Sequence, residues 1–171
     1  MFAFALWDAG RRRLLMARDP MGQKPFFYAL RGGELAFASE VKAILKTPGI
    51  SRELDIEGLA LYLNSLAVPA PYTIFRSIRK LKPAHCLRVE GNTLRIRKYW
   101  TPGIEVDWGL DEESVSDSFQ HLFSDAVKIR TIADVPLGVF LSGGIDSSAV
   151  VAFMSRHCPG QVKTFSVGFA D

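Results

Sequence analysis

The stretch that decides the fold of this chain is Leu137–Ser148, which reads L-G-V-F-L-S-G-G-I-D-S-S. Its apolar first half predicts a buried strand that ends in a Ser-Gly-Gly turn. The segment from about Ser147 to Arg156 is typical of a helix. A strand, a tight turn and a helix start in succession direct unpaired backbone N–H groups and the positive end of the helix dipole to one point. Such a point binds anions, most often phosphate.

Glycines and hydroxyl groups suit this turn to a phosphate. Gly143 and Gly144 can adopt positive φ and leave no Cβ in the way of an approaching phosphate, and the serines add hydroxyl donors. The turn lacks the Lys of a Walker A loop and the spacing of G-x-G-x-x-G. It resembles the S-G-G-x-D-S-S loop of the ATP pyrophosphatases, which cleave ATP between the α and β phosphates. Glycine turns between strand and helix are common, so the prediction of a nucleotide site rests on the whole string.

Composition narrows the class of protein. The chain has 171 residues, enough for one domain or parts of two, and its 48% hydrophobic content can form an ample core. The net charge of +3 is small, and the basic clusters at 11–13 and 76–82 are interpreted as solvated turns or strand faces rather than nucleic-acid patches. No apolar run approaches the roughly 20 residues of a membrane span. We therefore expect neither nucleic acid nor membrane as a partner.

The termini and cysteines indicate a cytoplasmic protein. The N-terminus lacks the basic region and long apolar core of a signal peptide. Cys86 and Cys158 are far apart, which predicts neither a disulfide framework nor a zinc site. His85 beside Cys86 suggests a nucleophile pair, but neighbouring residues on a strand point to opposite faces. A catalytic Cys86 is therefore disfavoured.

Periodicity divides the chain into two regions. The pattern of the first region predicts a β meander with a hairpin at 26–38. It then predicts a helix at 39–46 capped by Ser39, a helix capped by Asp55, and a hairpin at 86–99 around Gly91-Asn92. The second predicts a long amphipathic helix capped by Asp111, then the strand and helix described above and a strand at 163–168. Strand, helix and strand form one right-handed βαβ unit of a parallel sheet. We expect domains at 1–100 and 111–171, joined by a linker at 101–110.

Motifs along nearly the whole chain resemble glutamine-dependent asparagine synthetase. In the family's order, they read F-A-F-A-L-W-D, A-R-D-x-x-G-x-K-P, F-A-S-E-V-K-A, S-R-E-L-D, V-P-A-P-x-T-I-F, D-V-P-L-G-V-F-L-S-G-G-I-D-S-S and T-F-S-V-G-F. The resemblance implies an α+β region followed by an α/β region. The first would be the C-terminal half of a layered antiparallel glutaminase domain, and the second the opening βαβ unit of a parallel-sheet ATP pyrophosphatase domain.

The resemblance also implies an activity. Such an enzyme is a ligase that hydrolyses glutamine and, with ATP and Mg²⁺, converts aspartate to asparagine through β-aspartyl-AMP, releasing AMP and pyrophosphate. A homodimer of a longer parent is left open. The family's nucleophilic cysteine follows the initiator Met, whereas here Phe2 follows Met1 and matches the interior of the glutaminase domain. We therefore expect an internal fragment with no catalytic residue of its own, no assigned metal ligand and an acceptor pocket beyond Asp171.

The resemblance carries a few roles onto this chain. Asp19 matches the carboxylate that binds the α-amino group of glutamine, and the alternative is that it only caps the Asp-Pro turn. Glu40 and Lys42 are interpreted as structural. The residues that match the ATP site are Leu141, Ser142, Gly143, Gly144, Asp146, Ser147, Ser148 and Val167.

Two alternatives to that function stay open. A related amidotransferase or β-lactam synthetase-like enzyme would keep the same loop and use another acceptor. An inactive fragment would act at most as a binding module.

Overall fold

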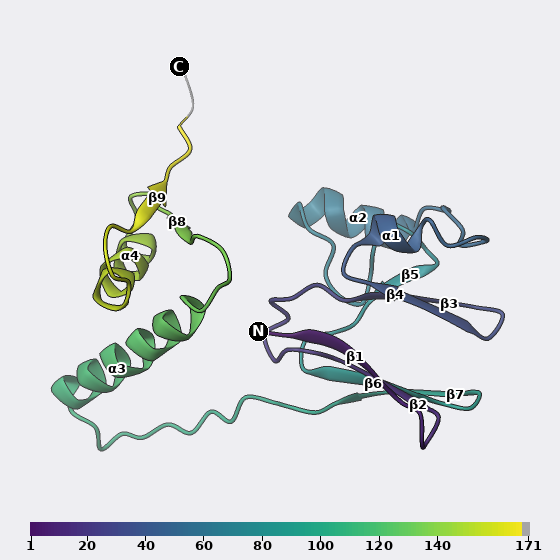
Figure 1. Cartoon of the computed structure of the whole chain (residues 1–171), viewed down its shortest axis with the longest axis horizontal. Coiled ribbons are helices and arrows are strands. Elements are labelled where there is room, and N and C mark those ends of the chain that lie inside the picture. Colours follow the sequence, from purple (N-terminus) through teal and green to yellow (C-terminus); the bar gives the residue numbers. More distant parts are fainter. Residues whose placement is uncertain (169–171) are drawn as a thin grey trace. The chain divides into compact units, whose positions relative to one another are not determined.

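The computed structural model describes residues 1–168. The chain divides into two compact units, Met1–Ile104 and Glu105–Asp171 (Figure 1). The last three residues of the predicted second domain lie outside the described residues. Across the described residues, no helix combines the length and the apolar character that crossing a membrane requires.

The first unit is built on two antiparallel sheets. The first sheet has the order β1-β2-β6-β7, with β1 at Ala3–Asp8, β2 at Arg13–Arg18, β6 at His85–Glu90 and β7 at Thr93–Lys98. The second has the order β4-β3-β5, with β4 at Glu34–Ala38, β3 at Phe27–Arg31 and β5 at Ile78–Lys80. Both predicted hairpins are confirmed, since β3 pairs with β4 and β6 pairs with β7. Gly91 has the positive φ of 55° that the second turn requires.

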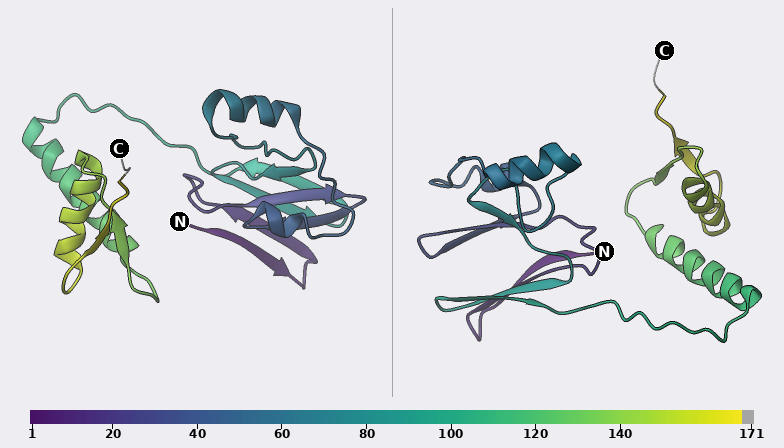
Figure 2. Two further views of the ribbon diagram at one scale, coloured as in Figure 1. Left: turned by 90° about the horizontal axis from the view of Figure 1, so that it is seen from above. Right: turned by 180° about the vertical axis from the view of Figure 1, so that it is seen from behind.

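The core of this unit lies between the sheets and behind the second one. Met16 and Leu87 of the first sheet pack with Phe26 and Leu81 in one cluster. Alternate residues point to opposite faces of a strand, so the other face of β3 packs with α1 (Val41–Ile44) in a second cluster. Figure 2 shows the two sheets stacked, with α1 and α2 (Ile56–Ser65) on the far side of the second sheet. The first unit is therefore α+β with antiparallel sheets.

Helix capping follows the sequence in part. The Asp55 carboxylate accepts hydrogen bonds from the N–H groups of Glu57 and Gly58 at 3.1 and 3.2 Å, which confirms the predicted cap of α2. The predicted Ser39 cap is wrong, because α1 begins at Val41 and its N-cap residue, Glu40, makes no side-chain cap.

The second unit holds α3 (Glu112–Arg130), β8 (Gly138–Phe140), α4 (Ile145–His157) and β9 (Lys163–Phe165). The predicted Asp111 cap is confirmed by a 2.8 Å bond from the Ser114 N–H. The strands β8 and β9 pair in parallel with α4 between them, so the predicted strand–helix–strand order is present. The helix begins two residues before its predicted start, because Gly144 acts as its N-cap.

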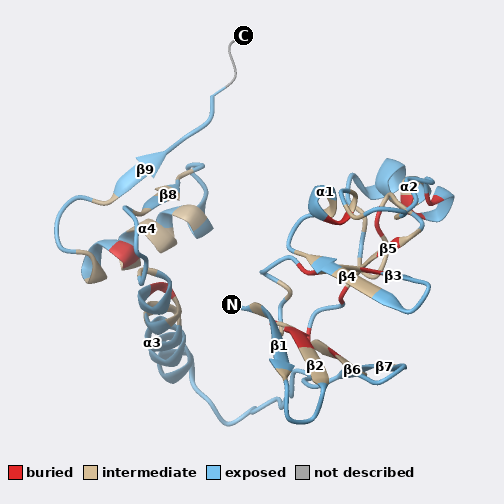
Figure 3. Cartoon of the chain, turned by 45° about the vertical axis from the view of Figure 1, so that its right-hand side comes forward, coloured by how far each residue is buried: buried red, intermediate tan, exposed pale blue. Residues whose placement is uncertain are grey.

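The expectation that β8 is buried is wrong for the described residues. Phe140 is 77% exposed and all of β9 is exposed (Figure 3). The physical reason is that the described sheet of this unit has only two strands, and buried parallel strands need layers on both faces.

Candidate functional site

The turn between β8 and α4 is exposed to solvent and leads directly into a helix start. Gly143 has a φ of +81°, and no heavy atom lies within 4 Å of the position that a Cβ would occupy there. Gly144 has a φ of −78°, so the expectation of positive φ holds for Gly143 and is wrong for Gly144. Gly144 makes no side-chain bond to the first turn of α4. The N–H groups at a helix start then need another acceptor, and an anion can supply it.

Serine hydroxyls tie this turn together. Ser147 Oγ accepts the Ser142 N–H at 3.2 Å, lies 3.0 Å from Ser142 Oγ and donates to the Gly144 carbonyl at 3.1 Å. The Ser148 N–H donates to the same carbonyl at 3.1 Å as the first helical bond. Ser147 therefore shapes the turn, and Asp146 lies exposed in the first turn of α4.

The ends of the two parallel strands meet beside the turn. The Leu141 N–H donates to the Phe165 carbonyl at 2.8 Å, and Ser166 Oγ donates to the Leu141 carbonyl at 2.6 Å. Val167 follows Ser166 and is 76% exposed. The fold thus brings Leu141 to the same strand ends as the segment that carries Val167, as ligand sites of parallel sheets require.

Asp19 lies in the first unit, where β2 ends. Its side chain is 2% exposed. The carboxylate accepts hydrogen bonds from the N–H groups of Gln23 and Lys24, both at 2.9 Å, and from that of Phe2 at 3.4 Å. Burial raises the pKa of the Asp19 carboxyl, but the bonds from Lys24, Gln23 and Phe2 outweigh it and hold the pKa below its usual value. The carboxylate is therefore anionic and occupied by main-chain donors.

Arg18 precedes Asp19 and binds the same loop, although the sequence did not single it out. Its Nε donates to the Lys24 carbonyl at 2.8 Å, Nη1 to that of Leu81 at 2.7 Å and Nη2 to that of Gly22 at 2.6 Å. Gly22 has a φ of +65°, and a Cβ there would lie 2.7 Å from Pro83 Cγ. Side chains alternate between the two faces of β2, so Arg18 lies on the same face as Met16, whose side chain packs in the core. This alternation is the sequence pattern that could have predicted an inward-facing Arg18.

Both side chains bind the main chain of the loop 19–24: Arg18 donates to its carbonyls, and Asp19 accepts from its N–H groups. These contacts match the alternative in which Asp19 stabilises the turn, and direct binding of glutamine by Asp19 stays a prediction. His85 Nδ1 contacts the Pro83 carbonyl at 2.7 Å, and the expectation that His85 and Cys86 do not act as a nucleophile pair stays a prediction. Across the described residues, no three His, Cys, Asp or Glu side chains gather as a metal ion would require.

Two family models match the chain. The glutamine amidotransferase domain matches residues 1–100 and asparagine synthase matches residues 118–171. Asparagine synthetase [glutamine-hydrolyzing] 3 of Bacillus subtilis is 38% identical over 100% of this chain and 28% of its own length. Putative asparagine synthetase [glutamine-hydrolyzing] 2 of Methanocaldococcus jannaschii is 36% identical over 99% of this chain and 34% of its own length. Amidase chyE of Penicillium rubens is 33% identical over 99% of this chain and 27% of its own length. The chain therefore spans about a third or less of the length of these relatives.

Proposed function

The chain belongs to the glutamine amidotransferase domain family. We propose that it is part of a glutamine-hydrolysing asparagine synthetase. In that reaction ATP activates aspartate as β-aspartyl-AMP with release of pyrophosphate. Ammonia from glutamine then displaces AMP to give asparagine. The motif order and the relatives that carry this name support the proposal. We assign residues 1–100 to the glutaminase half, 101–110 to a linker and 111–171 to the opening of the ATP-binding half.

The observation that carries the ATP assignment is the geometry of the turn 141–148. Gly143 combines a φ of +81° with open space in front of its Cα, and the start of α4 lacks a side-chain cap. A triphosphate can accept from these N–H groups without meeting a Cβ. Ser142 and Ser148 supply hydroxyls, and Leu141 and Val167 supply apolar flanks for the adenosine.

Magnesium accompanies ATP in this proposal, and no cluster of three or more His, Cys, Asp or Glu side chains lies among residues 1–168 to hold it. Asp146 is a single carboxylate in the first turn of α4, and a magnesium ion bound with phosphates needs one or two carboxylates. We assign the ion to the phosphates of ATP and leave its protein ligands unassigned.

For the glutaminase half we propose that Asp19 supports glutamine use by holding the loop 19–24. Its burial and its three main-chain bonds favour this indirect role over direct contact with the α-amino group. In either role, Asp19 should affect glutamine-dependent synthesis and leave ammonia-dependent synthesis intact.

A second candidate function keeps the same plan with another acceptor. The similarity to an enzyme named an amidase supports it. The test is pyrophosphate release from ATP with ammonia in the full-length parent, measured with and without aspartate, and with asparagine as the product to be detected. Release that requires aspartate and yields asparagine supports the first proposal. Release that ignores aspartate would refute it in favour of another acceptor.

A further inference from the structure

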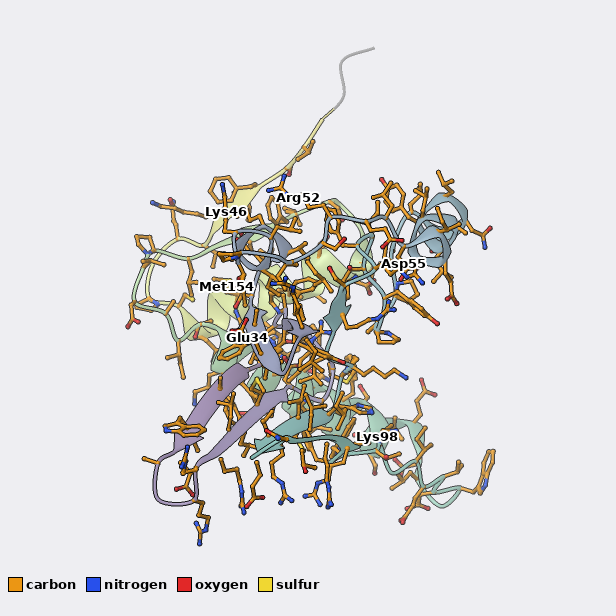
Figure 4. All side chains as sticks on the ribbon, turned by 90° about the vertical axis from the view of Figure 1, so that its right-hand side faces the viewer. Glu34, Lys46, Arg52, Asp55, Lys98 and Met154 are labelled. Atoms are coloured by element: carbon orange, nitrogen blue, oxygen red, sulfur yellow. The ribbon has the colours of Figure 1, made fainter. Side chains whose placement is uncertain are left out.

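The outer face of the first sheet carries a cluster of arginines. Met16 and Leu87 fix the inner face of β2 and β6, because they belong to the core between the sheets. Residues one position away point outward. In β6 and β7 these include Arg88 and Arg95, and Figure 4 shows nitrogen-tipped side chains projecting from this sheet on the side away from the second sheet.

The register of the sheet forces these positive charges together. Arg88 and Arg95 are direct cross-strand partners, and Arg97 is the partner of the neighbouring outward residue, Cys86. Like charges placed directly opposite each other destabilise a sheet. Such an arrangement therefore calls for an anion to offset it.

The carboxylate of Glu90 forms ion pairs with two of the guanidinium groups. Glu90 Oε1 lies 3.2 Å from Arg13 Nη2, and Glu90 Oε2 lies 3.7 Å from Arg88 Nη2. Hydrogen bonding and charge from Arg13, followed by the charges of Arg88 and Arg95, hold the pKa of the Glu90 carboxyl below its usual value. With Glu90 counted against Arg13, Arg88, Arg95 and Arg97, four positive charges minus one negative charge leave +3.

These side chains surround a depression of about 390 Å³. Its lining consists of Arg13, Leu15, Cys86, Arg88, Arg95 and Arg97. Arg13 Nε is buried there without a hydrogen-bond partner among the described residues. A buried donor without an acceptor is costly, and the lining of the depression contains no carboxylate that could accept from it.

We propose that this depression binds a multivalent oxyanion of the phosphate class. Guanidinium groups present planar, paired donors that match phosphate oxygens. A diphosphate group carries enough negative charge to offset the surplus, and its oxygens can accept from the guanidinium groups of Arg88 and Arg95. All six lining residues lie between positions 13 and 97. The site therefore shares no residue with the turn 141–148.

Cys86 gives this proposal a local readout. It lines the depression and is partly exposed, and both cysteines of the chain are free thiols. The probe is inorganic pyrophosphate at low salt, and the reagent is neutral iodoacetamide, with alkylation of each cysteine followed by peptide mass spectrometry. At pyrophosphate about ten times its Kd, alkylation of Cys86 should slow about tenfold if the occupied site does not react. Cys158, in the second unit, should react at an unchanged rate.

Paired variants separate the site from general electrostatics. Arg88→Gln with Arg95→Gln should abolish the protection of Cys86. The matched control is Lys46→Gln with Arg52→Gln, which removes two exposed positive charges elsewhere on the first unit and should preserve the protection (Figure 4). A Gly143→Val background should preserve it too, which excludes an effect transmitted from the turn 141–148.

A thermal unfolding series with the same variants checks folding. Pyrophosphate should raise the Tm of the parent and of the control pair by the same amount and leave that of the Arg88/Arg95 pair unchanged. The proposal is overturned if pyrophosphate fails to slow alkylation of Cys86 in the folded parent. It is also overturned if sodium chloride of equal ionic strength protects Cys86 equally, or if the control pair loses the protection.

Discussion

Gly143→Val tests the proposed ATP turn most directly. Gly143 has a φ of +81°, a conformation that a residue with a Cβ adopts at a cost of about 1–2 kcal/mol. No heavy atom lies within 4 Å of the new Cβ, so the folded chain can accommodate the side chain at the price of that strain alone. A phosphate that approaches this open space would, however, meet the valine.

The expected loss of ATP affinity is larger than the loss of stability. Displacing a phosphate from one backbone donor removes a charge-assisted hydrogen bond of about 1.5–3 kcal/mol, which is about a ten- to hundredfold weaker Kd. Titration calorimetry measures the Kd for ATP, and pyrophosphate release with aspartate and saturating ammonia in the full-length parent measures the use of ATP. Saturating ammonia keeps the glutaminase half out of the result.

Gly160→Val is the matched control. Gly160 also has a positive φ, of +97°, and open space at its Cβ position, but it lies after α4 and outside the turn. It should lose a similar amount of thermal stability and keep the ATP affinity of the parent. Gly144→Ala should be well tolerated, since its φ is −78° and its nearest contact, Ser142 Oγ, lies at an ordinary 3.6 Å. A folded Gly143→Val protein with the ATP affinity of the parent would refute the assignment of the turn.

Three further outcomes are expected in the first unit. Asp19→Asn should destabilise it by about 1–3 kcal/mol, because a buried amide group replaces an acceptor of backbone N–H groups. The pKa of Asp19 is lower in the folded state, so its contribution to the free energy of unfolding is present above the unfolded pKa and is lost as the pH falls through the folded pKa. The Tm difference between parent and variant should therefore shrink in acid. An unchanged Tm with a raised KM for glutamine would instead show direct contact. Gly22→Ala should lower the Tm more than Gly32→Ala does, because both have positive φ but only the first places a Cβ 2.7 Å from Pro83 Cγ; equal losses would contradict the close packing. Arg18→Gln should lower the urea midpoint by the equivalent of at least about 2 kcal/mol, since the loop carbonyls lose their donors, whereas a midpoint equal to the parent's would show that water replaces the guanidinium.

Local features were predictable from short stretches of sequence. The caps at Asp55 and Asp111 and the turn at Gly91 each depend on bonds within a few residues. The strand–turn–helix at 137–148 was predictable for the same reason, and so was the positive φ of Gly143. In each case the interacting groups lie within the same short stretch of sequence that carries the pattern.

Positions that depend on distant neighbours were not predictable. The burial of β8 was expected from its apolar residues, but burial depends on how many strands and layers surround a strand, and the described sheet has two. The role of Asp19 likewise depends on the N–H group of Phe2, at the start of the first hairpin, and on a loop that Arg18 ties to Leu81.

The sequence by itself determined the local elements and, through the order of its motifs, the family. Only the tertiary structure decided that β2 pairs with β6, about seventy residues later in the chain, and thereby that Arg13 shares a face with Arg88 and Arg95. The physical reason is that a cap or turn is stabilised by bonds within its own segment, whereas strand order is selected by the free energy of burying two sheets against each other. That free energy belongs to the whole unit, so no single segment of the sequence reveals it.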